Sequence, residues 1–341
     1  MITHRNVLAT TAGSSQCPGL SLKEFPPGKG NLVYLSFLPL SHIFERINTN
    51  ALYSRGIAMG FFQGDVLKIR DDLMELKPTV LAAVPRLYNK FFSVIKDTIS
   101  KFDEKKKAKV NKVINKKLDN LKNHGAYKHK LYDKVAFSKM KRAVGGRVQC
   151  CVSGSAPLSA EVSDFLKIAF YCPILEGFGA TETTSGCILQ NPDQYLAGDC
   201  GAPMVSCEVK VIDVEEMKYT SKDETDGKPT PRGELLIRGP NIFKGYYKAE
   251  EKTKEAIDKD GWYHTGDIAK ILPNGSVKIV DRRKNIFKLS QGEYIAPEKV
   301  ENLYVLHPCV AEVWVNGDST RDFCVVFVVP EKEPFEKFAQ Q

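Results

Sequence analysis

The sequence lacks the features that mark membrane-spanning, secreted or metal-clustering proteins. No run approaches the roughly 18 apolar residues of a membrane span, and the stretch from Met1 to Asn6 has neither an apolar segment nor a small-residue cleavage site. The nine cysteines have no metal-ligand spacing, so we expect reduced thiols, with Cys150 and Cys151 in a buried strand. The hydrophobic content of 43% and charged content of 26% are typical of a globular protein.

Positive charge is concentrated in one block. The stretch from Val94 to Arg142 holds sixteen basic and five acidic residues, a net charge of +11, while the whole chain has a formal charge of +8. Apolar residues recur in this block at helical spacing, so the lysines should cover the exposed face of amphipathic helices. Two interpretations stay open: a solvated helix face, or a surface that contacts anionic lipid. Nucleic-acid binding is disfavoured, because the block has no recognisable motif and little aromatic interleaving.

The first part of the chain, to about residue 197, alternates apolar runs of strand length with helical patterns. This alternation predicts an α/β fold in which helices cover a parallel sheet. Strands are expected at 32–38, 80–84, 148–152 and 173–177, and helices at 69–76 and 159–170.

The remainder of the chain has a different texture. Short strands split by turn residues predict an antiparallel β subdomain over about 198–280, with a surface loop at 220–231. Within it, Asn274 and Gly275 should both adopt the positive φ angles of a two-residue hairpin turn. A helix near Pro297 and two further strands indicate the start of a small α+β domain. The strands are expected at 208–213, 233–239, 268–272, 276–281, 310–315 and 323–329.

Three segments carry candidate chemistry. In residues 152–159 a strand runs into small residues and then a helix with Ser159 as its N-cap, which lets a planar ring lie against the backbone. An ordinary strand-to-helix turn has the same pattern. In residues 175–184 Phe178 stands between two glycines, and Thr181 and Glu182 follow, a hydroxyl and a carboxylate suited to phosphate and Mg²⁺. A glycine-rich loop with polar decoration is the alternative.

The third segment runs from Asp260 to Lys284. Asp267, in a tight turn after a glycine, could accept two hydrogen bonds from a ribose diol. The basic cluster that follows supplies positive charge for phosphate or carboxylate oxygens. A solvated basic turn is an equally simple interpretation.

Together these segments resemble the fatty acyl-CoA synthetases of the adenylate-forming superfamily, and the eukaryotic long-chain branch in particular. Residues 260–284 resemble the family's signature segment, and 177–183 resemble its adenine-binding motif, with Phe178 where Tyr is usual. Further stretches that resemble family motifs are 38–46, 84–88, 233–239, 245–247 and 287–298.

The resemblance implies a domain plan. Residues 1–280 would belong to the large N-terminal domain, 281–288 to a hinge and 289–341 to the small C-terminal domain. The family's phosphate-binding loop lies before a stretch like Met1 to Asn6, and its adenylating Lys lies beyond a position like Gln341. The chain is therefore expected to be the central part of a longer enzyme, with little ligase activity of its own.

The resemblance also implies an activity, the conversion of a long-chain fatty acid, ATP and coenzyme A into acyl-CoA, AMP and pyrophosphate through an acyl-adenylate. Thr181 would contact the α-phosphate and Glu182 would bind Mg²⁺. Asp267 would hold the ribose hydroxyls beside Arg282, and Lys288 would line the thioester-forming conformation. The other expected nucleotide and coenzyme A contacts are Gly154, Ser155, Ala156, Pro157, Glu176, Gly177, Phe178, Gly179, Lys284 and Gly292.

The acyl chain requires an apolar tunnel, because each buried methylene is worth about 0.8 kcal/mol. Its expected walls include His42, Phe44, Gly64, Val84 and Arg86, although His42 could instead be a core histidine. The complete protein is expected to face the cytosol and to associate with a membrane, at the endoplasmic reticulum or another organelle, without binding nucleic acid.

Two alternatives remain. One is a non-catalytic paralogue that only binds nucleotide or acyl groups. The other is a different member of the superfamily, either luciferase-like or another coenzyme A ligase such as an aryl-CoA ligase. Those proteins usually lack a lysine-rich helical insertion like the one from Val94 to Arg142, which argues against them.

Overall fold

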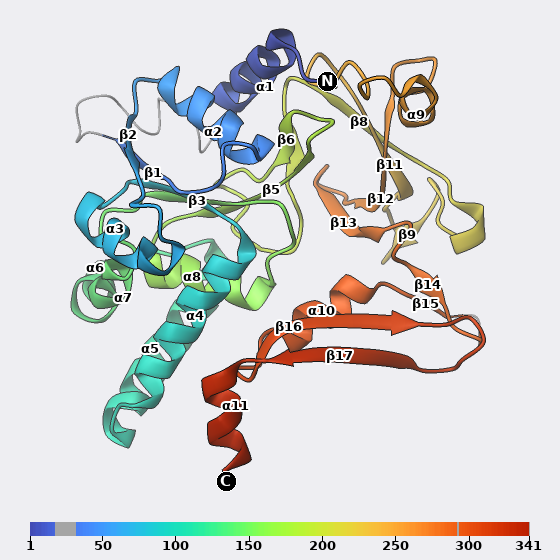
Figure 1. The fold of residues 1–341 in the computed structure, drawn as a ribbon. Helices are drawn as coiled ribbons and strands as arrows, with labels where there is room; N and C mark the ends of the chain where they lie inside the picture. Colours follow the sequence, from blue (N-terminus) through green and yellow to red (C-terminus); the bar gives the residue numbers. More distant parts are fainter. Residues whose placement is uncertain (18–31, 292, 341) are drawn as a thin grey trace. The chain divides into compact units, whose positions relative to one another are not determined.

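The computed structural model describes residues 1–17, 32–291 and 293–340 (Figure 1). The chain forms two compact units. Unit 1 comprises Met1–Glu208 and Arg238–Lys254, and unit 2 comprises Val209–Ile237 and Glu255–Gln341. The predicted boundaries at 197, 280 and 288 stay predictions.

Unit 1 is built on a seven-stranded sheet in the order β2-β1-β3-β4-β5-β6-β7. Strands β1 to β5 pair in parallel, and β6 and β7 continue the sheet in antiparallel fashion. The α/β prediction is confirmed, and each predicted strand of this unit overlaps an observed one. The strands are β1 (Val33–Ser36), β2 (Ala58–Phe61), β3 (Val80–Ala83), β4 (Cys150–Ser153), β5 (Ile174–Ala180), β6 (Ser185–Leu189) and β7 (Ala202–Pro203).

Helices cover both faces of this sheet. In Figure 1, α1 and α2 lie on one face, and α4, α5 and α8 lie on the other. The predicted helix at 69–76 is confirmed as α3. The helices are α1 (His4–Gln16), α2 (Ile43–Tyr53), α3 (Ile69–Leu76), α4 (Pro85–Ser100), α5 (Glu104–His124), α6 (Lys130–Tyr132), α7 (Ser138–Arg142), α8 (Ala160–Phe170) and α9 (Glu250–Ala256), with a 3₁₀ turn at Val66–Lys68 and a π-helical turn at Asp133–Phe137.

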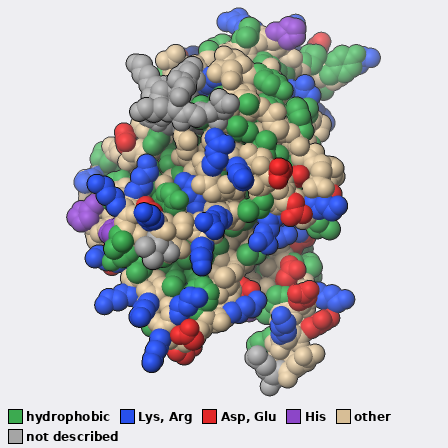
Figure 2. All heavy atoms as spheres, turned by 90° about the vertical axis from the view of Figure 1, so that its left-hand side faces the viewer, with side chains coloured by type: hydrophobic (Ala, Val, Ile, Leu, Met, Phe, Trp, Pro, Cys, Tyr) green, Lys and Arg blue, Asp and Glu red, His purple; other side chains and the backbone are tan. Residues whose placement is uncertain are grey.

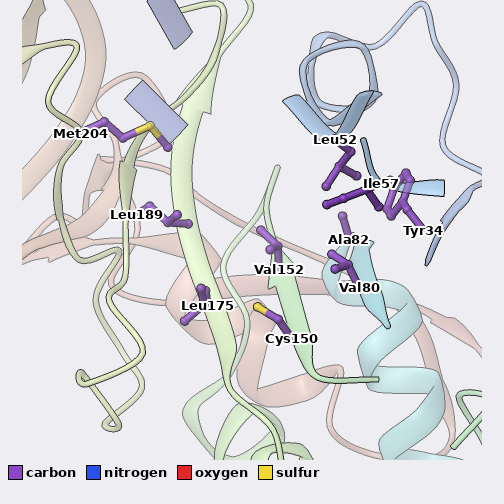
Figure 3. Close-up of a cluster of buried hydrophobic side chains, with 10 residues drawn as sticks. All are labelled: Tyr34, Leu52, Ile57, Val80, Ala82, Cys150, Val152, Leu175, Leu189 and Met204. Carbon is purple, nitrogen blue, oxygen red and sulfur yellow. The ribbon is translucent and has the colours of Figure 1, made fainter. Parts of the chain in front are cut away.

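Apolar side chains from neighbouring strands, together with Leu52 of α2 and Ile57, form a core beside the sheet (Figure 3). A parallel sheet is covered on both faces, which explains why its strands read as nearly continuous apolar runs. Strand β4 follows this rule, and Cys150 and Cys151 are both fully buried, as expected. No two of the described cysteines form a disulfide. The cluster drawn comprises Tyr34, Leu52, Ile57, Val80, Ala82, Cys150, Val152, Leu175, Leu189 and Met204.

Helix α5 confirms the amphipathic pattern, with one exception. Ile114 and Leu121 are buried as predicted, but Lys117 lies on the same face and is only 1% exposed. Its ammonium group forms an ion pair with Asp133 and donates to the Ile168 carbonyl at 2.8 Å. Burial lowers the pKa of Lys117, while Asp133 opposes that shift. Lys117 is therefore a core residue and contributes nothing to the charged surface, although it belongs to the basic block.

Unit 2 contains a four-stranded sheet in the order β13-β12-β11-β8, which confirms the predicted antiparallel β subdomain. The predicted loop at 220–231 carries a small hairpin of its own. The strands are β8 (Glu208–Ile212), β9 (Glu224–Thr225), β10 (Lys228–Pro229), β11 (Arg232–Arg238), β12 (Tyr263–Ile271) and β13 (Val277–Arg282), with a 3₁₀ turn at Glu215–Met217.

The turn between β12 and β13 differs from the two-residue hairpin that was predicted. Gly275 has a φ of +83°, but Asn274 does not enter the positive region. The Gly275 N–H donates to the Leu272 carbonyl at 2.8 Å, and the Leu272 N–H donates to the Ser276 carbonyl at 2.8 Å. Pro273 fixes φ near −65° at the first central position, so the chain adopts a longer loop that ends in a left-handed glycine.

The last part of unit 2 confirms the helix that was predicted near Pro297 and the two strands after it. Residues from this part share an apolar cluster with the four-stranded sheet, in which Ile286 packs with Val214, Met217 and Ile268. The elements are β14 (Phe287–Lys288), β15 (Tyr294–Ile295), α10 (Pro297–Tyr304), β16 (Val310–Gly317), β17 (Cys324–Pro330) and α11 (Lys332–Ala339). Among the described residues, no helix has both the length and the apolar content needed to cross a bilayer.

The Lys117–Asp133 pair generates a test of the fold. Replacing Asp133 by Asn keeps an acceptor for the His129 N–H but leaves the buried ammonium without its counter-charge. We expect the free energy of unfolding to fall by about 3 kcal/mol, measured by urea denaturation. The double variant Lys117→Met/Asp133→Asn removes both charges and should be more stable than Asp133→Asn alone. An Asp133→Asn variant as stable as the parent chain would contradict this account.

Candidate functional site

The predicted turn after β4 begins at the carboxyl end of a buried parallel strand. Gly154 is buried, Ser155 adopts a φ of +75°, and Ser155 to Pro157 are exposed. The Ser159 hydroxyl accepts from the Val162 N–H at 3.3 Å, so the predicted N-cap of α8 is confirmed. The turn thus presents backbone and small side chains at the edge of the sheet where ligands of open α/β folds bind.

Strand β5 brings Phe178 to the same edge. The parallel register places Glu176 opposite Ser153, immediately before the turn, and Phe178 follows two residues later, half-buried. Gly179 has a packing role, because a Cβ there would lie 2.0 Å from the Ser185 carbonyl oxygen. Close approach of β6 therefore explains this glycine without a ligand.

Glu176 connects the two segments. Its side chain is 8% exposed, and Oε2 accepts from the Leu158 N–H of the turn at 3.4 Å. Burial raises the pKa of Glu176 to about 7, and the nearby Lys167 ammonium opposes that shift, whereas Asp199 and Asp164 add to it. The contact shows Glu176 as a support beneath the turn, a role that the sequence did not reveal.

Thr181 and Glu182 stand in the tight turn between β5 and β6. Thr181 is exposed and Glu182 half-buried, whereas Thr183 and Thr184 are buried. The Tyr246 hydroxyl donates to Glu182 Oε1 at 2.9 Å. Burial and the Glu182 carboxylate raise the pKa of Tyr246 to about 12, so the phenol remains a donor. The sequence singled out 245–247 as motif-like but assigned Tyr246 no role.

These residues fit a magnesium ion only if a ligand completes its coordination. Glu182 supplies one carboxylate, and the described residues contain no group of three His, Cys, Asp or Glu side chains that could hold a metal. Mg²⁺ commonly binds one or two carboxylates together with substrate phosphates. The donor set around Glu182 is therefore compatible with a metal–nucleotide complex rather than with a metal held by protein alone.

The expected acyl-chain residues fall into two groups. Phe44 lies against the turn, because a Cβ at Gly154 would be 3.3 Å from its ring, and Val84 directly follows β3, whose last residue pairs with Ser153. His42 is exposed and caps α2 by accepting from the Phe44 N–H at 3.2 Å, so the core-histidine alternative is wrong. The remaining two are exposed: Gly64, which has a φ of +90°, and Arg86, in the first turn of α4.

Unit 2 holds the remaining expected residues. Asp267 was predicted to lie in a tight turn, and this prediction is wrong, because Asp267 lies inside β12. At this point in the strand Gly266 has a φ of +71°, and the β11–β12 register shifts. This bulge arises because glycine enters the left-handed region without strain. Asp267 pairs with Arg282 across the β12–β13 ladder, and Arg282 Nε lies 3.7 Å from Asp267 Oδ1. The expected pair of residues is thus brought together.

The basic residues at and after the end of β13 have different surroundings. Arg283 forms ion pairs with Glu216 and Glu234, the second at 2.9 Å, so its charge serves the fold of unit 2. Lys284 is exposed, and Lys288 Nζ lies 5.4 Å from the centre of the Tyr294 ring. Gly292 lies outside the described residues.

Comparison with known proteins places the chain in a family. A family model described as AMP-binding enzyme matches residues 1–247. The chain belongs to the AMP-binding enzymes. The predicted resemblance to adenylate-forming enzymes is thereby confirmed.

The AMP-binding relatives include long-chain synthetases. The chain is 45% identical over 339 residues to long chain acyl-CoA synthetase 7, peroxisomal, of Arabidopsis thaliana, covering 99% of this chain and 47% of that protein. It is 42% identical to long-chain-fatty-acid–CoA ligase 1 of Homo sapiens, covering 100% and 47%. The chain therefore spans about half the length of the curated relatives it matches.

A solved structure of an AMP-binding enzyme has the same fold. It is the A domain of carboxylic acid reductase from Segniliparus rugosus, in complex with AMP and a co-purified carboxylic acid. The TM-score is 0.73 at 29% identity, and the match covers 99% of this chain and 48% of that chain.

Glu176 generates a prediction about pH. Its pKa is about 7 in the folded chain against an ordinary value of 4.5, so between these values the folded state holds a proton that the unfolded state has released. The free energy of unfolding should therefore fall, relative to a Glu176→Gln variant, as the pH rises from about 4.5 to about 7, by about 3 kcal/mol at most. Urea denaturation at a series of pH values measures this difference.

The exposed Glu161 on α8 provides the matched control. Glu161→Gln should leave the pH profile of the parent chain unchanged. Parallel profiles for the parent chain and Glu176→Gln would show that the buried carboxyl does not titrate in this range.

Proposed function

We propose that the protein activates long-chain fatty acids with ATP and coenzyme A through an acyl-adenylate. The observation that carries the proposal is the gathering of the 154–157 turn, Phe178, Thr181 and Glu182 at the carboxyl edge of the unit 1 sheet. An aromatic ring, exposed backbone, a hydroxyl and a carboxylate are the groups that a nucleotide and its metal ion require. Similarity to long-chain synthetases supports the fatty acid as the second substrate.

The first half-reaction joins the fatty carboxylate to the α-phosphate of ATP and releases pyrophosphate. Negative charge accumulates around phosphorus in the transition state, so positioned donors and cations provide most of the catalysis. In this proposal Thr181 donates to an α-phosphate oxygen, and Phe178 stacks on the adenine opposite the turn. Glu182 holds Mg²⁺, which would neutralise phosphate charge when bound. The second half-reaction transfers the acyl group to the coenzyme A thiolate and releases AMP.

The family resemblance gives residues of unit 2 further roles in this proposal. Asp267 accepts from the ribose hydroxyls, with Arg282 beside it, and Lys284 adds positive charge. Residues 281–288 act as the hinge on which the small domain turns between the half-reactions, because a few backbone angles can absorb such a rotation. Lys288 then lines the thioester-forming arrangement.

An apolar channel for the acyl chain is proposed beside the turn. Phe44 and Val84 supply its inner wall, since both adjoin the ends of β3 and β4. His42, Gly64 and Arg86 belong to its outer part in this proposal. Each methylene that enters such a channel contributes about 0.8 kcal/mol to binding.

Pyrophosphate release tests the proposed activity. The protein expressed from its complete natural coding sequence should release pyrophosphate on addition of a fatty acid, faster with long chains than with short or aromatic acids. Glu182→Gln should lower the adenylation rate by about 10²-fold to 10³-fold, whereas Glu250→Gln, at an exposed position of α9, should not. Absence of acid-dependent release would favour a non-catalytic nucleotide-binding protein, and preference for aromatic acids would favour another coenzyme A ligase.

We further propose that the complete protein faces the cytosol and contacts an anionic membrane through α5. Lys105, Lys109, Lys112 and Lys116 are exposed and lie opposite the buried face of this helix. Lys and Arg side chains gather on the lower part of the face drawn in Figure 2. A basic stripe of this kind matches the negative potential of anionic lipid, and each lysine near such a surface contributes about 1 kcal/mol.

Vesicle co-sedimentation tests the membrane contact. Replacing Lys105, Lys109, Lys112 and Lys116 by Gln should weaken binding to phosphatidylserine vesicles by about two to three orders of magnitude. Neither protein should bind pure phosphatidylcholine. The control replaces four exposed lysines of unit 2 with Gln and changes the net charge equally. An equal loss in both variants would contradict a role specific to α5. The control lysines are Lys218, Lys222, Lys228 and Lys259.

A further inference from the structure

The hydrogen bond between Tyr246 and Glu182 joins residues 64 positions apart in the sequence. The phenol donates to Oε1 at 2.9 Å, which leaves Oε2 of the same carboxylate for a cation. Both residues belong to unit 1, so their contact does not depend on how the two units are arranged.

Tyr246 is held in place by its own surroundings. Its ring packs edge-to-face on the buried Phe243, with 4.8 Å between the ring centres. Its N–H donates to Thr253 Oγ1 at 2.9 Å. Gly245, with a φ of +135°, permits this approach, because a Cβ there would lie 2.6 Å from Thr253 Cγ2. These contacts hold the Tyr246 ring and backbone in place, so the hydroxyl is directed at Glu182.

The backbone around Glu182 is secured separately. The Phe243 N–H donates to the Glu182 carbonyl at 2.8 Å. The buried Asn241 donates to the Thr183 carbonyl at 3.2 Å and accepts from the Thr184 hydroxyl at 2.7 Å. These bonds already join the two loops, so the Tyr246 hydroxyl is not needed for that purpose. What it adds is control of the carboxylate itself.

Asn6 stabilises the segment that leads to Tyr246 through two further hydrogen bonds. Its amide donates to the carbonyls of Pro240 and Ile242 at 2.8 and 2.7 Å. Since Asn6 stands in the first turn of α1 and is 6% exposed, the segment that carries Tyr246 is fastened both to a helix and to the Glu182 turn. Such a doubly anchored segment can set side-chain geometry with little freedom.

We propose that Tyr246 is a positioning residue that orients the Glu182 carboxylate toward the metal ion of a bound metal–nucleotide complex. The inference rests on the proposed function, in which Glu182 is the metal ligand. A donor on one oxygen fixes the rotamer of the carboxylate and directs the second oxygen at the cation. Hydrogen-bond partners of metal ligands commonly change metal affinity or activity by about 10-fold to 100-fold when they are removed.

Metal-dependent nucleotide binding tests this role without requiring turnover. Calorimetric titration of the complete natural protein with a non-hydrolysable ATP analogue is carried out with Mn²⁺ and, separately, with EDTA. Tyr246→Phe keeps the ring against Phe243 and should weaken binding in Mn²⁺ by about 10-fold to 100-fold, while binding in EDTA stays unchanged. Tyr247→Phe, at the neighbouring exposed tyrosine, removes an equivalent hydroxyl and should alter neither value.

The outcomes separate the positioning role from the proposed function. Equal weakening of Tyr246→Phe in Mn²⁺ and EDTA would reveal general support of the pocket and overturn the proposal, as would no weakening at all. Glu182→Gln serves as the reference and should abolish the benefit of Mn²⁺. If it does so while Tyr246→Phe behaves as the parent protein, only the positioning role fails. If Glu182→Gln retains the benefit, or the parent protein binds no nucleotide, the proposed function fails and the positioning role with it.

Discussion

The parallel pairing of β4 and β5 is the constraint on which the site in unit 1 depends. Because Ser153 stands opposite Glu176, the turn that leaves β4 and the strand that continues to Phe178 emerge at one edge of the sheet. A register slip by one residue would reverse the face of every side chain in a strand. Apolar residues of β4 and β5 pack together in the core shown in Figure 3, which holds the two segments in their relative position.

Buried charge is the second constraint, because unit 1 encloses several ionisable groups near this edge. Lys167 is 2% exposed, and its Nζ donates to the Tyr195 carbonyl at 3.0 Å. Asp164 Oδ1 lies 4.0 Å from the same Nζ. Burial lowers the pKa of Lys167, and the nearby carboxylates of Asp164 and Glu176 oppose that shift. The turn that Glu176 supports therefore lies over a group of buried ionisable side chains. Removing one of them would leave its partner buried without a counter-charge, which destabilises the fold far more than the intact group stabilises it.

The α/β architecture could be predicted because it depends on local patterns. Apolar runs define the parallel strands, and Ser159 marks the start of α8 by a hydroxyl that needs only its own turn to act. The bulge at Gly266 could not be predicted, because a glycine is equally compatible with a turn and with a left-handed residue inside a strand. Lys117 escaped prediction for a related reason: its burial depends on Asp133, and nothing in the helical pattern of α5 indicates that partner.

The candidate site could likewise be predicted only in part. Residue types that suit a nucleotide are visible in the sequence, but the contacts that hold them join distant segments: Phe44 with Gly154, Asn241 with Thr183, and Tyr246 with Glu182. The sequence motifs therefore do not act separately, because side chains of one motif contact and support residues of another. Gly179 shows the consequence, since its place among residues 177–183 is explained by the approach of β6 alone. A residue within a motif can serve to support a neighbouring segment, and only the three-dimensional contacts distinguish such support from ligand binding.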